Sequence, residues 1–265
     1  MIDWGSWRSE PILVGALVLL GWLYALATGP LRARLAPWAP FPRREAARFG
    51  AGLGLLYLAW GSPLDLIGRY YLCSVHAALD LLVLFPAAML LLRGLPAWLT
   101  EPALARARPA ARLLFHPVVA SLVFVLVVSG SYLPRPFEAA LRSDGWRAAQ
   151  AAVLLAAALL FWRPLLSRSA VLPPPGYGGR LAYLFATEVS LTGVFTYILM
   201  AEHGMYPTYE HAPRLVAALT PYEDQVLAGV LLSAVSSVVL VGTLGLNFYR
   251  WYQADQALGR GPVNR

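Results

Sequence analysis

Residues 70–85 read YYLCSVHAALDLLVLF, an apolar run that contains a thiol, an imidazole and a carboxyl group at Cys73, His76 and Asp80. With the apolar residues that follow, the run exceeds the length of about 20 residues that a helix needs to cross a bilayer. We therefore expect a membrane-spanning helix over residues 70–92. Helices in lipid normally exclude ionisable groups, so the three polar side chains call for an explanation.

The whole chain has the composition of an integral membrane protein. Of its 265 residues 58% are hydrophobic and only 13% are charged, whereas soluble domains carry about 25% charged residues. The sequence predicts an all-α polytopic membrane protein, a seven-transmembrane-helix bundle that forms one domain over residues 1–265. The six further spans are expected at residues 11–28, 47–64, 113–133, 148–166, 181–200 and 225–247.

The distribution of arginine predicts the orientation of this bundle. Fifteen of the 21 arginines lie in the C-terminal tail and in the connecting segments 29–48, 93–112 and 163–180. Because basic loops stay on the cytoplasmic side, we expect the N-terminus outside and the C-terminus in the cytoplasm. The same clustering in short loops argues against a nucleic-acid-binding protein, which would carry a basic groove.

Several functions of seven-helix membrane proteins are excluded by the residues that the chain lacks. It contains no lysine, so a retinal Schiff base cannot form. It contains one cysteine, so no intramolecular disulfide can form and a disulfide-exchanging enzyme is excluded. No zinc-protease motif is found. We therefore predict a role without enzymatic activity.

Cys73, His76 and Asp80 are spaced by three and four residues, which places them on one face of the expected helix. Thiolate, imidazole and carboxylate are all metal ligands, and the softer two favour copper or zinc over magnesium or calcium. A hydrogen bond between His76 and Asp80, with Cys73 as a small apolar filler, explains the same pattern. Both interpretations stay open at this point.

A second group of candidate ligands lies in the expected outside loop MAEHGMYPTYEHAPR, residues 200–214. Methionine sulfur and imidazole together favour Cu(I), so His203, Met205 and His211 could capture copper there. An aromatic-rich loop at the membrane interface accounts for the same residues. Glu188, within the expected sixth span, is a further intramembrane carboxyl group whose partner the sequence does not reveal.

Five stretches carry a resemblance to a known family: WGSPLDLIGRYYLCSVH, FHPVVASLVFVLVVSGSYLPRPFEAAL, LLFWRPLL, MYPTYEHAPR and YEDQVLAGVLL. In this order and spacing, the chain resembles the CtaG-type, multi-span assembly factors of bacterial cytochrome c oxidase over most of its length. The resemblance implies a bundle of about seven helices and a part in maturing copper-containing oxidases. It also implies oxidase membrane subunits as partners and a bacterial cytoplasmic (inner) membrane location.

The chain departs from the family where the resemblance implies histidines. The third span of the family typically carries two histidines four residues apart, and these positions are His76 and Asp80 here. The fifth span of the family usually begins with further histidines, but this chain has DGWRAAQAAV there, with Arg147, Gln150 and Ala151. His116 and the pair Asp224–Gln225 do match family positions.

These observations lead to one leading prediction and one alternative. The chain is expected to support cytochrome c oxidase, as a copper-site assembly factor or as a retained accessory subunit of the respiratory complex. The expected copper ligands are His76, Asp80, Cys73, His203, Met205 and His211. The alternative is a proton- or ion-coupled transporter that uses His76, Asp80 and Glu188.

Overall fold

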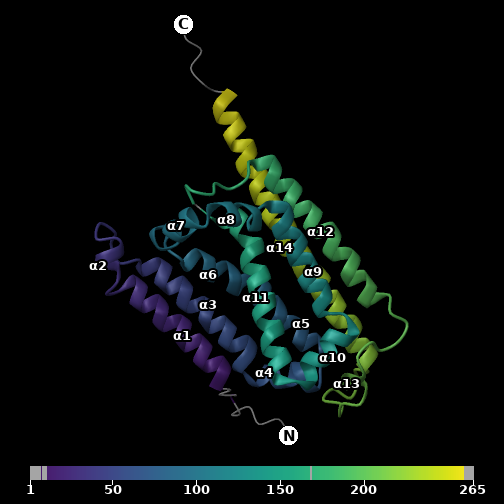
Figure 1. Ribbon diagram of the computed structural model, residues 1–265. Helices are drawn as coiled ribbons and strands as arrows, with labels where there is room; N and C mark the ends of the chain where they lie inside the picture. Colours follow the sequence, from purple (N-terminus) through teal and green to yellow (C-terminus); the bar gives the residue numbers. More distant parts are fainter. Residues whose placement is uncertain (1–6, 8–10, 168, 260–265) are drawn as a thin grey trace.

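The computed structural model describes residues 7, 11–167 and 169–259, and every regular element in that part of the chain is a helix (Figure 1). The long helices run side by side between two ends. They are α1 (Pro11–Thr28), α3 (Arg43–Gly61), α5 (Cys73–Leu82) with η1 (Val83–Ala87) and α6 (Ala88–Gly94), α9 (Pro117–Ser131), α11 (Asp144–Leu166), α12 (Tyr177–Leu199) and α14 (Pro221–Gly259).

Short helices close the two ends of the bundle (Figure 1). One end, called here the arginine-rich end, carries α2 (Arg32–Leu35), α7 (Ala97–Arg106) and α8 (Arg108–Leu114). The other, called here the α4–α10 end, carries α4 (Pro63–Tyr70), α10 (Pro134–Arg142) and α13 (Pro207–Glu210). The C-terminal part of α14 extends past the arginine-rich end, where the sequence predicts the cytoplasm (Figure 1).

The structure supports a membrane-spanning bundle, while the number of spans stays a prediction. In the described part of the chain, four helices are long and apolar enough to cross a bilayer, namely Cys73–Gly94, Asp144–Leu166, Tyr177–Leu199 and Pro221–Gln256. A fifth span results if α8 and α9, which meet at a bend of 56°, cross together. Helix α1 is apolar but shorter, and α3 begins with arginines and a glutamate. Orientation is likewise a prediction that the helices alone do not test.

The bounds of several elements differ from the prediction. The short connection expected between the spans 47–64 and 70–92 belongs to a helix, α4, and the third long helix begins at Cys73 rather than at residue 70. Pro63 gives α4 a typical helix start, because proline is favoured in the first turn, where its missing N–H is not needed. The Ser62 side chain at the N-cap position makes no capping hydrogen bond. Helix α14 continues for twelve residues beyond the expected end at 247.

The expected third span contains a π-helical turn, η1, at Pro86. Proline supplies no backbone N–H, so the regular hydrogen-bond ladder cannot continue through it. The N–H of Ala88 instead bonds to the carbonyl of Val83, five residues earlier. The indole Nε1–H of Trp162, from α11, donates to the carbonyl of Leu84 at 2.9 Å. A side chain of a neighbouring helix thus satisfies a carbonyl inside the irregular turn.

Close packing of α3 against α6 depends on glycine at two positions, Gly52 and Gly94. A Cβ at Gly52 would lie 2.8 Å from the Leu91 side chain, so α3 and α6 touch there. A Cβ at Gly94 would lie 2.6 Å from the Phe49 backbone nitrogen, which fixes a second contact of the same pair. At Gly50 and Gly54, by contrast, a Cβ would have no neighbour within 4 Å. They leave open space beside α3.

Candidate functional site

A cavity of about 40 Å³ lies inside the α4–α10 end of the bundle. Its walls come from α3, α4, α5, α10 and α11, which the sequence separates widely. The lining residues are Ala59, Trp60, Asp65, His76, Leu79, Asp80, Ala140, Arg147, Gln150, Ala151 and Leu154. The volume is sufficient for one or two water molecules or an ion.

The wall of this cavity contains His76 and Asp80, which the sequence predicted to lie on one helix face. Helix α5 places His76 Nε2 3.6 Å from Asp80 Oδ2, as residues four apart on one helix face allow. The same Asp80 oxygen accepts a hydrogen bond of 2.9 Å from the Tyr132 hydroxyl group, at the end of α9. The His76 ring lies 4.8 Å from the ring of Phe137 in α10, which restricts its rotation.

Two ion pairs fasten the helices around the cavity. Arg147 Nη1 of α11 contacts both carboxylate oxygens of Asp65 of α4, at 2.9 and 2.8 Å. Arg69, also in α4 and 4% exposed, pairs with Asp144 at the start of α11 and donates from Nε to the Leu141 carbonyl. The Arg147–Asp65 pair is largely shielded from solvent, whereas Asp144 in the second pair is 68% exposed. They hold α4 against α10 and α11.

The cavity unites the positions at which the resemblance implies histidines. His76 and Asp80 come from α5, and Arg147, Gln150 and Ala151 come from the first two turns of α11. The amide Nε2 of Gln150 donates to the Ser131 carbonyl at 3.3 Å, but its Oε1 is buried without a hydrogen-bond partner. Gln150 lines the cavity, so a buried acceptor without a partner lies on a residue of the cavity wall.

Cys73 lies outside this cavity, although it shares the helix face of His76. Its side chain is 2% exposed and belongs to the larger of two clusters of buried hydrophobic side chains, which includes Phe124, Phe137 and Phe161 and is called here the larger hydrophobic cluster. Its backbone N–H donates to Asp224 Oδ2, and Ser74 donates both its N–H and its hydroxyl group to Asp224 Oδ1. A carboxylate from α14 therefore caps the N-terminus of α5, where Leu72 at the cap position has no capping side chain.

The residues of the 200–214 loop do not converge on one point. His203 and His211 are exposed, and His211 Nδ1 lies 2.7 Å from the Pro207 carbonyl. Met205 is partly buried and packs against the larger hydrophobic cluster. Its N–H donates to Gln225 Oε1 at 2.6 Å. The family-matched pair Asp224–Gln225 thus supports α5 and this loop.

Two buried tyrosines of this loop fix it onto the bundle. The Tyr206 hydroxyl group donates to the Tyr132 carbonyl at 2.8 Å, and the Tyr209 hydroxyl group donates to the Gly68 carbonyl at 2.5 Å. Burial raises the pKa of Tyr206 and of Tyr209 well above the usual value near 10, so both hydroxyl groups stay protonated donors. The pair links the loop to α4 and α9.

His116 and Glu188 lie away from the cavity. His116 is exposed at the N-cap position of α9, at the arginine-rich end. Glu188 of α12 accepts a hydrogen bond from Ser237 of α14 through Oε1, while its Oε2 is buried without a hydrogen-bond partner. Neither residue meets His76 or Asp80 in the wall of the cavity.

Within residues 7, 11–167 and 169–259, no group of three or more His, Cys, Asp or Glu side chains is placed to hold a metal ion. The copper ligand set therefore stays a prediction, and of its six residues only His76 and Asp80 lie together in the cavity wall. Sequence reasoning missed Tyr132, Asp65 and Phe137 as neighbours of the His76–Asp80 pair. The sequence offered one indication of polar contacts at this place, since Asp65 and Arg69 are two charged residues four positions apart in the short segment between two expected spans.

Comparison with protein families gives one result. The family model described as cytochrome c oxidase caa3 assembly factor matches residues 22–254. The match includes every helix that lines the cavity. No curated protein and no solved structure matches the chain.

Proposed function

Because the chain belongs to the family of cytochrome c oxidase caa3 assembly factors, we propose that it assists assembly of the copper-containing part of such an oxidase. It acts as a multi-pass protein of the bacterial inner membrane, with oxidase membrane subunits as its partners and without a catalytic step of its own. The observation that carries the proposal is the cavity, which gathers His76, Asp80 and the α11 positions of the family motif.

Copper is the cargo in this proposal, and His76 and Asp80 are its ligands in the cavity. An imidazole nitrogen and a carboxylate oxygen bind copper, and Gln150 adds an amide oxygen with no other partner. A set this small suits transfer, since an ion held by few ligands can be released. His203, Met205 and His211 are the proposed point of first capture, with Cys73 behind the cavity as a softer ligand.

A specific observation also favours the second version, a retained accessory subunit. The charged side chains around the cavity already have partners within the chain: Arg147 with Asp65, and Asp80 with Tyr132 and His76. A polar cluster satisfied in this way needs no metal to be stable in the bundle interior. Neither the fold nor the family match supports the ion-coupled transporter.

The deciding experiment measures metal content of the full chain in detergent after Cu(I) loading under reducing conditions. The variants are His76→Ala/Asp80→Ala and the more conservative His76→Gln/Asp80→Asn, with Asp255→Ala, an exposed carboxylate of α14, as the control. The copper proposal predicts about one copper per chain, lost in both double variants and kept in the control.

Oxidase measurements in cells separate the two versions. If copper is the cargo, both double variants lower the copper content and activity of the oxidase. If the protein is an accessory subunit, it binds no copper, yet it co-purifies with the oxidase. Copper content and oxidase activity that stay unchanged in the double variants contradict the assembly role of this pair.

A further inference from the structure

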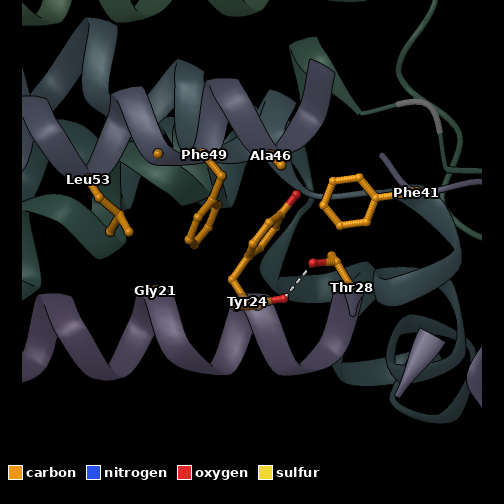
Figure 2. A pocket seen from close by; sticks show the side chains of 9 residues that line it. Gly21, Tyr24, Thr28, Phe41, Ala46, Phe49 and Leu53 are labelled. Atoms are coloured by element: carbon orange, nitrogen blue, oxygen red, sulfur yellow. Dashed lines mark hydrogen bonds between the residues drawn. The ribbon is translucent and has the colours of Figure 1, made fainter. Parts of the chain in front are cut away.

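A groove of about 230 Å³ lies between α1 and α3 (Figure 2). It lies toward the arginine-rich end of these helices (Figure 1), and none of its lining residues belongs to the cavity described above. Figure 2 shows Tyr24 and Thr28 on α1, Ala46, Phe49 and Leu53 on α3, and Phe41 beside them from the preceding connector. Gly21, Ala25 and Gly50 complete the lining. Almost the whole lining is apolar.

Glycine keeps this groove open. A Cβ at Gly50 would meet nothing within 4 Å, and one at Gly21 would only touch Leu53 at 3.4 Å. The floor is rigid by contrast, because the rings of Tyr24 and Phe49 stack with their centroids 4.1 Å apart. Helix α1 packs chiefly against α3, so the groove lies in the main contact that holds α1 to the bundle.

The polar atoms of the groove are already satisfied. The Tyr24 hydroxyl group donates to the Gly94 carbonyl at 2.9 Å, and the Thr28 hydroxyl group donates to the Tyr24 carbonyl at 2.8 Å. An occupant therefore gains nothing from hydrogen bonding inside the groove, and an apolar chain fits it best. The volume accommodates roughly eight groups of the size of a water molecule or a methylene.

The sequence around the groove's end is basic and rich in interfacial side chains. Segment 29–48 contains five arginines and one glutamate. Arg43 is exposed and lies three residues before Ala46, so it occupies the same face of α3 one turn beyond the groove. Trp38 and Phe41 are exposed nearby, at 78% and 50%. Exposed aromatic residues beside arginines are typical of the headgroup region of a bilayer.

We propose that this groove binds one acyl chain of an anionic phospholipid from the surrounding bilayer, with the phosphate group against Arg43. The apolar lining takes the chain, and the positive charge of the 29–48 segment selects the anionic headgroup. The acyl chain fills the space between α1 and α3 that the glycines leave open.

The test compares two glycine variants of the full chain. Gly50→Leu fills the groove, while Gly54→Leu, one turn further on, adds the same side chain to open space that does not line it. Each protein is exchanged into mixed micelles of detergent with equal amounts of phosphatidylglycerol and phosphatidylcholine. Native mass spectrometry then counts the lipids retained. Size-exclusion chromatography confirms that each variant is folded.

The groove proposal predicts one retained phosphatidylglycerol in the wild type and in Gly54→Leu, and at least a tenfold lower occupancy in Gly50→Leu. Arg43→Gln retains a lipid but loses the preference for phosphatidylglycerol over phosphatidylcholine. Equal occupancy in the wild type and Gly50→Leu overturns the proposal. So does a dimer, or an attached oxidase subunit, that Gly50→Leu alone removes, because the occupant is then a protein helix.

Discussion

Asp224 caps the N-terminus of α5, and the resulting prediction can be tested by labelling the chain's single cysteine. Asp224 is 2% exposed and accepts hydrogen bonds from the N–H groups of Cys73 and Ser74 and from the Ser74 hydroxyl group. In Asp224→Ala these donors lose their acceptor in a buried place. Each buried donor left unsatisfied costs about 1–3 kcal/mol.

When the two backbone donors are counted, the substitution should lower the local stability of the N-terminus of α5 by about 3 kcal/mol. This corresponds to roughly a hundredfold increase in the fraction of molecules in which this helix end is locally unfolded. Asp224→Asn keeps one acceptor oxygen, so its effect should be about half as large in free energy, or roughly tenfold. Thiol labelling measures this directly, because Cys73 is the only cysteine and is buried when the helix is closed.

The assay follows the rate at which a thiol-reactive dye labels the full chain in detergent at fixed pH. Asp255→Ala is the matched control, since it removes an exposed carboxylate from the same helix and should leave the rate unchanged. If Asp224→Ala is folded and labels within twofold of the wild-type rate, the carboxylate does not hold α5 and the reasoning is wrong.

Two further predictions concern packing, and both are read from the midpoint of thermal unfolding by fluorescence-detected size-exclusion chromatography. Gly94→Ala places a methyl group 2.6 Å from the Phe49 nitrogen and should cost about 1–3 kcal/mol, whereas Gly50→Ala meets nothing and should be neutral. Trp162→Phe removes a buried indole hydrogen bond to the π turn and should cost about 1–3 kcal/mol; Trp146→Phe removes an exposed one of the same kind and should cost far less. Equal midpoints within either pair would contradict the corresponding contact.

The long helices could be predicted because the bilayer imposes the pattern. A segment in lipid must satisfy its backbone internally and carry apolar side chains, so most of the predicted spans lie on a long helix. The expected span 113–133 is divided between α8 and α9, which meet at a bend of 56°. The segments that connect the spans were harder to predict. PLDLIGRY has two charged residues and only eight positions, which reads as a turn, yet it forms α4 because Asp65 and Arg69 find partners on α11. Those partners lie about 80 residues away, and one sequence does not reveal them.

The same limit applies to the candidate site. A spacing of four residues was enough to predict that His76 meets Asp80, because both are on one helix. The contacts from Tyr132 and Phe137 depend on which helices are neighbours, and periodicity carries no information about that. Gly50 is the reverse case. Small residues usually indicate helix contact in lipid, but here the small residue leaves a groove instead.

Contacts outside the His76–Asp80 pair also hold α5 in place, and this decides how the copper experiment is interpreted. Asp224 caps the helix from α14, and Tyr209 ties α13 to α4 beside it. Replacing the pair should therefore leave Cys73 protected from thiol labelling. Copper that is lost while Cys73 stays protected identifies His76 and Asp80 as ligands. Copper that is lost together with Cys73 protection shows only that α5 has moved, and then the two residues support the helix rather than the metal.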